Sequence, residues 1–224
     1  MTVNISNLTI TTPVATSSTN PVALELNGAK AIAQYPSVVN VLADGSVQFS
    51  APTKGASSKS THRTRCEWKE ANYWSLASAA EHIKMQEMTL TKVNSAQKVV
   101  ISQLHVKDDD SPPVKIFWSK GNITMGFRET FNQTAPINTT LLKGVPLGVK
   151  FNVTICILAS GALTVTASCN GKAGSSGSLH MDSSWYSSLL NFHGGVYNQV
   201  DYTDATPADD GSICIISDLS LTHA

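Results

Sequence analysis

Short segments that alternate apolar and polar residues recur along this chain, and they constrain its fold more than any other feature. Residues two apart on a strand point to the same face, so such alternation predicts half-buried β-strands. KVVISQLHV at 98–106 and KFNVTICILA at 150–159 follow this pattern, and Gly, Pro, Asn, Asp and Ser cluster between the segments. Similar segments predict further strands at 45–52, 114–119, 123–131, 162–170, 189–199 and 212–222.

Helical periodicity is weak. The stretch 23–35 predicts either a helix or an irregular segment, and 75–83 predicts at most one helical turn. LASGAL at 158–163 is typical of a tight hairpin that joins two strands. Because no long linker or internal repeat divides the chain, we expect one all-β domain over 1–224. Its expected architecture is a β-sandwich or jelly roll of two antiparallel sheets with a concave groove.

Charge and composition limit the classes of partner. Lys and Arg number 16, Asp and Glu also number 16, and the pI is near 7. Nucleic acid is therefore not expected as a partner, because no basic excess meets its phosphates. No run approaches the roughly 18 apolar residues that span a bilayer, so no membrane association is expected. An acidic ligand stays compatible with this composition if positive charge gathers locally.

Sequons and cysteines favour an extracellular protein. The first residues lack the pattern of a signal peptide, but six glycosylation sequons favour a secreted eukaryotic glycoprotein whose leader is missing from this sequence. The four cysteines lack C-x-x-C spacing, which disfavours zinc; one or two disulfides are expected, with three full pairings open and free buried thiols as the alternative. The cysteines are Cys66, Cys156, Cys169 and Cys214, and the sequons begin at Asn4, Asn7, Asn122, Asn132, Asn138 and Asn152.

The segment HRTRCEWKE at 62–70 holds two of the chain's three arginines. On a strand, Arg63, Arg65 and Glu67 share one face, while Cys66 and Trp68 take the other. Since the planar guanidinium binds carboxylates through two parallel hydrogen bonds, the segment predicts a site for a carboxylate-bearing ligand. The alternative is an exposed ladder of ion pairs.

Two further segments add proton-transferring groups. VVISQLHVK places Gln103, His105 and Lys107 on one face, and NFHGGVYNQ at 191–199 places alternate residues on one face in the same way. Its two adjacent glycines indicate a close approach of ligand or backbone, or a bulge. Plain solvated strand faces are the alternative interpretation. The residues sharing a face in the second segment are Asn191, His193, Gly195, Tyr197 and Gln199.

Arg, Gln, His and Tyr together suit removal of a proton next to a carboxylate. Arg and Gln neutralise the carboxylate, which makes the proton on the adjacent carbon more acidic. His or Tyr can accept that proton, and Tyr can protonate the departing oxygen.

The three segments resemble the motifs of the family 7 polysaccharide lyases, the alginate lyases with a jelly-roll fold. The family blocks are Arg–Ser/Thr–Glu–Leu/Val–Arg, Gln–Ile/Val–His and Tyr–Phe–Lys–x–Gly–x–Tyr–x–Gln. Here they stand in the same order as RTRCE, QLH and NFHGGVYNQ. The resemblance covers most of the chain from about residue 40, with a family-like start at NLTITTP.

Several positions depart from the family pattern. RTRCE carries Arg, Arg, Glu at alternate positions where the family has Arg, Glu, Arg, which leaves open whether Arg63 or Arg65 meets the carboxylate. His193 replaces the usual Lys, and Asn191 replaces the usual leading Tyr. Leu104 is neither of the usual middle residues of the second block, so the preference for mannuronate or guluronate stays open.

The resemblance implies a secreted, monomeric alginate lyase that acts by β-elimination without a cofactor or a metal. The alternatives are a lyase on another polyuronate, such as glucuronan, and a non-catalytic carbohydrate-binding jelly roll. A jelly-roll glucanase is disfavoured because the paired carboxylates of an E-x-D-x-x-E strand are absent. The implied catalytic residues are Tyr197, His105, Gln103, Arg63 and Arg65, and the implied substrate-binding residues are Glu67, Lys115, His193, Gln199 and Asn191.

Overall fold

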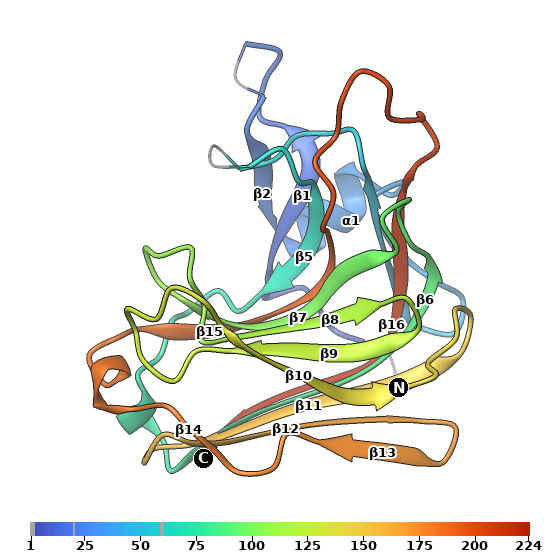
Figure 1. Cartoon of the computed structure of the whole chain (residues 1–224). Helices are drawn as coiled ribbons and strands as arrows, with labels where there is room; N and C mark the ends of the chain where they lie inside the picture. Colours follow the sequence, from blue (N-terminus) through green and yellow to red (C-terminus); the bar gives the residue numbers. More distant parts are fainter. Residues whose placement is uncertain (1–2, 20, 59–60) are drawn as a thin grey trace.

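The computed structural model describes residues 3–19, 21–58 and 61–224, and folds them into two stacked antiparallel sheets (Figure 1). The first, called the groove sheet below, has the order β10 (Ile137–Lys143), β9 (Asn122–Phe127), β8 (Val114–Ser119), β7 (Lys98–Val106), β15 (Leu190–Asn198), β5 (Arg65–Lys69), β1 (Thr9–Ala15) and β2 (Ala23–Asn27). The second has the order β13 (Lys172–Ser175), β12 (Ala162–Cys169), β11 (Lys150–Leu158), β6 (Glu81–Lys92), β16 (Gly211–His223), β4 (Val47–Pro52) and β3 (Val39–Val41), and β14 (Leu179–His180) pairs with β12.

The expected jelly-roll sandwich is confirmed. β7 and β8 occupy the predicted ranges, and β11 and β12 are joined by the predicted hairpin, in which Gly161 has a φ of +84°. Alternation places the apolar residues of both sheets in the space between them, where Phe49, Trp68, Phe151 and Phe192 are fully buried. The opposite face of the groove sheet is therefore left to polar side chains.

The N-terminal segment differs from the sequence-based expectation, and β6 was not predicted as a strand. Residues 23–35 form β2 followed by helix α1 (Gly28–Gln34), which Asn27 caps through its side chain. The turn expected at 75–83 is confirmed as the 3₁₀ turn η1 (Leu76–Ser78), and a second one, η2, spans Ser183–Trp185. Among the described residues, no helix is both long and apolar enough to cross a bilayer.

The expected disulfides are not formed, since all four cysteines are free thiols. Cys156 on β11 is partly exposed, while Cys169 on the neighbouring β12 is buried, so their side chains leave opposite faces of the second sheet. Cys66 and Cys214 are fully buried on facing sheets, and burial raises the pKa of both thiols. These two therefore act as small core residues.

Candidate active site

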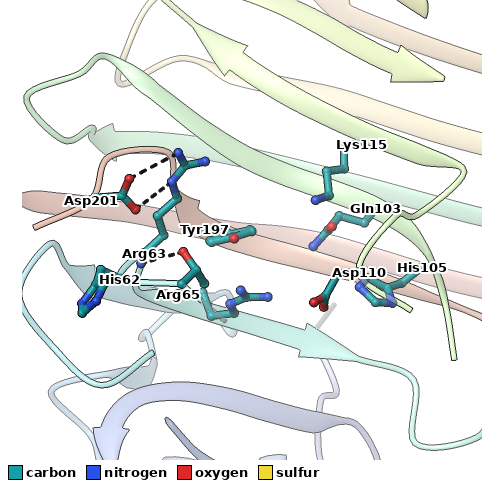
Figure 2. Close-up of a pocket in the computed structure, with 10 residues that line it drawn as sticks. His62, Arg63, Arg65, Gln103, His105, Asp110, Lys115, Tyr197 and Asp201 are labelled. Atoms are coloured by element: carbon teal, nitrogen blue, oxygen red, sulfur yellow. Dashed lines mark hydrogen bonds and ion pairs between the residues drawn. The ribbon is translucent and has the colours of Figure 1, made fainter. Parts of the chain in front are cut away.

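A cavity of about 510 Å³ lies over the centre of the groove sheet (Figure 2). Strands β8, β7, β15 and β5 are neighbours there, so residues far apart in sequence meet on one surface. Their register places Tyr197 opposite Arg65, His193 opposite Gln103, and Gln103 opposite Lys115. The residues lining the cavity are Thr61, His62, Arg63, Arg65, Gln103, His105, Asp110, Lys115, Tyr197 and Asp201.

The pairing of β15 with β7 is irregular at the two adjacent glycines. The pairing of β15 with β7 shifts register between Gly194 and Tyr197, and Gly195 has a φ of +127°. A Cβ at Gly195 would lie 2.4 Å from the carbonyl oxygen of Cys66 on β5. The glycine pair therefore serves a close approach of two backbones, which was one of the expected readings, together with the bulge.

Arg65 lies directly against Tyr197 in the groove. Its guanidinium carbon lies 3.7 Å from the centre of the Tyr197 ring, and its Nη1 lies 3.7 Å from Oε2 of Glu67. The buried Nε of Arg65 has no hydrogen-bond partner in the described part of the chain. Because 17% of the Arg65 side chain is exposed, its guanidinium can still donate to a carboxylate in the groove.

Glu67 lies beneath the groove and is only 2% exposed. Its Oε1 accepts a hydrogen bond from Nε2 of Gln103 at 2.7 Å, so it orients the Gln103 amide as well as Arg65. Burial raises the pKa of Glu67, against the lowering effect of Arg65 and Gln103. The geometry gives Glu67 an orienting position rather than the open contact with substrate that its sequence suggested.

His105 presents a neutral imidazole beside Gln103. Its Nδ1 lies 2.8 Å from the carbonyl oxygen of Val106, and a carbonyl can only accept, so Nδ1 carries the proton. In the neutral ring, the lone pair of Nε2 is then available as an acceptor. Burial lowers the pKa of His105 to about 4, helped by the positive charges of Lys115 and Arg65.

His193 and Asn191 are buried rather than open to the groove. His193 is 8% exposed and its ring stacks on that of His105, while Asn191 is fully buried. His193 and Glu67 border a second cavity of about 280 Å³, which shares Arg65 and His105 with the first. The sequence placed His193 and Asn191 among substrate-binding residues, because strand parity reveals the face of a residue but not its depth.

Arg63 and Arg65 both line the cavity but differ in their surroundings. Arg63 has 39% of its side chain exposed and pairs with Asp201, with 3.1 Å between Nε and Oδ1 (Figure 2). Arg65 has 17% exposed and is paired with Glu67. The more buried arginine is therefore the one beside Tyr197 and Gln103.

The charged strand begins two residues later than the sequence suggested. β5 starts at Arg65, and Arg65, Glu67 and Lys69 alternate with the buried Cys66 and Trp68. RCEWK thus matches the quoted first block as Arg, Glu and a basic residue, so the apparent exchange of Arg and Glu disappears. Lys69 was missed, although this shifted reading was available in the sequence; it borders the second cavity and pairs with Glu25.

The remaining candidates fall at the rim or away from it. Lys115 lines the cavity from β8, and burial lowers its pKa. Gln199 is not among the lining residues, and its amide donates to the carbonyls of Tyr197 and Asn198. Asp110, which the sequence did not single out, borders both cavities. His62 also lines the groove.

No group of three or more His, Cys, Asp or Glu side chains suited to a metal ion occurs within residues 3–19, 21–58 and 61–224. Several chemically active side chains meet at the groove. They comprise a stacked guanidinium, an amide, a neutral imidazole, a phenol and a nearby lysine. Such a set can neutralise a carboxylate and move a proton beside it.

Comparisons with known proteins agree with this fold. The family model described as alginate lyase matches residues 3–223. An alginate lyase from Pseudomonas aeruginosa aligns with a TM-score of 0.84 and 23% identity over 99% of this chain and 100% of that chain. An alginate lyase from Klebsiella pneumoniae aligns with a TM-score of 0.83 and 19% identity over 99% of this chain and 97% of that chain. Family 7 alginate lyase A1-II′, in complex with substrate (GGMG), aligns with a TM-score of 0.79 and 20% identity over 98% of this chain and 94% of that chain. No curated protein matches the chain.

Proposed function

The chain belongs to the alginate lyase family and is a polysaccharide lyase that cleaves alginate, and we propose that it does so by β-elimination in the groove formed by β5, β7, β8 and β15. In this proposal Arg65 and Gln103 bind the uronate carboxylate, and Tyr197 and His105 handle protons. The proposal rests above all on one observation, the guanidinium of Arg65 stacked on the Tyr197 ring in the cavity that Gln103 and His105 also line.

The first step is neutralisation of the carboxylate. The partly exposed guanidinium of Arg65 donates to one oxygen, and Gln103, which gives one N–H of its amide to Glu67, has a second N–H for the other oxygen. Withdrawal of charge makes the proton on the adjacent ring carbon more acidic. Arg63 is less suited to this role because Asp201 already holds its guanidinium at a more exposed position.

The second step is the elimination itself. A base removes the proton, and the electrons of the C–H bond form a double bond to the neighbouring carbon. The glycosidic carbon–oxygen bond breaks with its electron pair on the departing oxygen, which Tyr197 protonates. The base is the Nε2 of neutral His105 or the phenolate of Tyr197, depending on the side of the ring on which the proton lies.

The polymer is tested directly by comparing poly-mannuronate, poly-guluronate and glucuronan. The absorbance of the unsaturated uronate that elimination creates is followed in the ultraviolet, with Tyr197→Phe as the matched inactive control. We expect absorbance to grow on at least one alginate polymer. Growth on glucuronan alone would move the substrate to another polyuronate, and silence on all three polymers with retained binding would make the groove a carbohydrate-binding site.

We further propose that the protein is secreted and acts as a monomer. Of the six sequon asparagines, five are exposed and Asn122 is partly exposed, so attached glycans would meet no packed core. Expression through a eukaryotic secretory pathway should give a mass that falls on endoglycosidase treatment. Size-exclusion chromatography with light scattering should return the 23.8 kDa chain mass once glycans are removed.

A further inference from the structure

His105 and His193 form a parallel stack at the floor of the groove. Their ring centres lie 4.6 Å apart and their planes differ by 3°. The two residues lie on neighbouring strands, β7 and β15, where Asn191 is opposite His105 and His193 is opposite Gln103. His193 thus covers one face of the His105 ring, and its own exposure of 8% leaves little of it for a polymer to contact.

The orientation of His193 is set by a chain of hydrogen bonds from outside the groove. The Nδ2 of Asn191 donates to the carbonyl oxygen of Glu70 at 3.1 Å, which fixes the direction of the Asn191 amide. Its Oδ1 therefore faces the Nε2 of His193 at 3.0 Å, and this nitrogen must carry the proton. Since the Nδ1 of His105 donates to Val106, both stacked rings have a defined neutral tautomer.

We propose that His193 is a positioning residue for the elimination. Its ring holds the His105 ring in the orientation that leaves the Nε2 lone pair available as an acceptor. The inference rests on the proposed function, because it assigns the purpose of the stack to His105. It differs from the sequence-based expectation, in which His193 binds substrate.

The cations around the stack oppose protonation of both rings, whereas the carboxylates of Glu67 and Asp110 favour it. His105 faces Lys115 on β8, Arg65, Glu67 and Lys69 on β5, and Asp110 in the loop after β7, and Lys84 on β6 approaches His193 from the core. Burial lowers the pKa of His193 well below its ordinary value, and His105 and nearby cations lower it further. A second proton would turn either ring into a buried cation stacked on the other ring. Burial disfavours such a charge, so both rings stay neutral in mild acid.

Nitrogen-15 NMR of the histidine rings in the wild-type protein tests the arrangement without any activity measurement. At pH 6 we expect a neutral His105 protonated on Nδ1 and a neutral His193 protonated on Nε2. A cationic His105 at pH 6, or the opposite tautomer on either ring, would overturn the proposal.

Two variants then separate the effect of the His193 ring from the effect of its hydrogen bond to Asn191. His193→Phe keeps a flat ring on His105, whereas His193→Gln keeps a polar group beside Asn191 but removes the stack. We expect His193→Gln to move the His105 pKa toward its ordinary 6.5, so that kcat/KM falls about tenfold at pH 5.5 and less than about twofold at pH 8. His193→Phe should keep the wild-type pH profile, and KM should change little in either variant.

The outcomes separate this inference from the proposed function. If both variants shift the pH profile alike, or if both mainly raise KM, His193 binds substrate or serves another role and the inference is wrong. If the wild type lacks lyase activity on every polyuronate, the proposed function fails instead, while the NMR result still decides whether the stack sets the state of His105. Should His193→Gln not fold, the wild-type tautomers and the profile of His193→Phe carry the test.

Discussion

The guanidinium carbon of Arg65 lies 3.7 Å from the centre of the Tyr197 ring, and the two residues are opposite each other across β5 and β15. One side chain proposed to bind the carboxylate is thus in contact with the side chain proposed to move the proton. Cation–π contact of this kind favours a fixed ring and a fixed guanidinium. Loss of the Tyr197 hydroxyl should therefore lower turnover while binding remains, whereas loss of Arg65 should remove the proposed carboxylate contact.

Tyr197→Phe keeps the ring that Arg65 covers and deletes only the hydroxyl. We expect turnover to fall at least about a hundredfold, the usual scale for losing a positioned acid or base, while oligo-uronate still binds. Turnover is measured by ultraviolet absorbance and binding by calorimetry. Tyr202→Phe removes a phenol from a cavity next to the groove and serves as the matched control. Near wild-type turnover in Tyr197→Phe would refute the proposed mechanism.

Arg65→Ala and Arg63→Ala compare two arginines that line one cavity. Arg65 should matter more because it is more buried, has an unpaired Nε and contacts Tyr197. We expect kcat/KM to fall at least about a hundredfold in Arg65→Ala, a typical loss for removing a donor to a developing anion. Arg63→Ala should lose less than about tenfold, since its charge is already paired with Asp201 in solvent. Equal losses, or a larger loss at Arg63, would reassign the carboxylate contact.

Glu67→Gln tests whether the buried carboxyl group orients the groove at a cost in stability. Burial holds the pKa of Glu67 above its unfolded value, so the folded state loses stability as the pH rises through the unfolded value near 4.5. The variant should therefore match the wild type in free energy of unfolding at pH 4 and exceed it at pH 7.5, measured with urea. Turnover should fall, because Arg65 loses its charged partner. A variant less stable than the wild type at pH 7.5 would contradict this account.

The site could be predicted from the sequence in part, because strand parity depends only on the backbone. QLH and NFHGGVYNQ placed Gln103, His105 and Tyr197 on one surface, and the structure brings them together. Parity does not reveal which pairs of strands are neighbours or how deep a side chain lies. The burial of Asn191 and His193 follows from their contacts with Glu70 and His105, which sequence does not display.

The position of β5 was mistaken by two residues for a related reason. Arg63 and Arg65 have the same parity, so alternation alone could not decide which of them begins the strand. The choice is made by tertiary pairing, which sets Arg65 opposite Tyr197 and Lys69 opposite His193. Asp110 and Asp201 escaped notice because they lie in loops, where no periodicity relates a residue to a face.

β6 was not predicted because its core-facing side carries polar residues. His82, Lys84 and Gln86 point inward and are almost fully buried, whereas Met85 on the opposite face is 52% exposed. An alternation rule that expects apolar residues inside therefore gives no clear strand here. Tertiary contacts satisfy these groups, since Lys84 donates to the hydroxyl of Ser102 and the Nε1–H of Trp68 donates to Gln86.

Lys84 leads to the last prediction, because a fully buried ammonium opposes folding. Burial lowers its pKa from 10.5 to about 7, so the unfolded chain binds the extra proton more strongly. The free energy of unfolding should then rise with pH between about 7 and 10.5, and the full cost of the buried charge is present below about 7.

Lys84→Met fills a similar volume without a charge. At pH 6 it should stabilise the protein by about 1–4 kcal/mol, as replacement of buried charges by apolar groups often does. The gain should shrink at pH 10, and urea denaturation of both proteins at the two pH values measures it. A variant that is less stable than the wild type at pH 6 would mean that the bond to Ser102 outweighs the cost of burial.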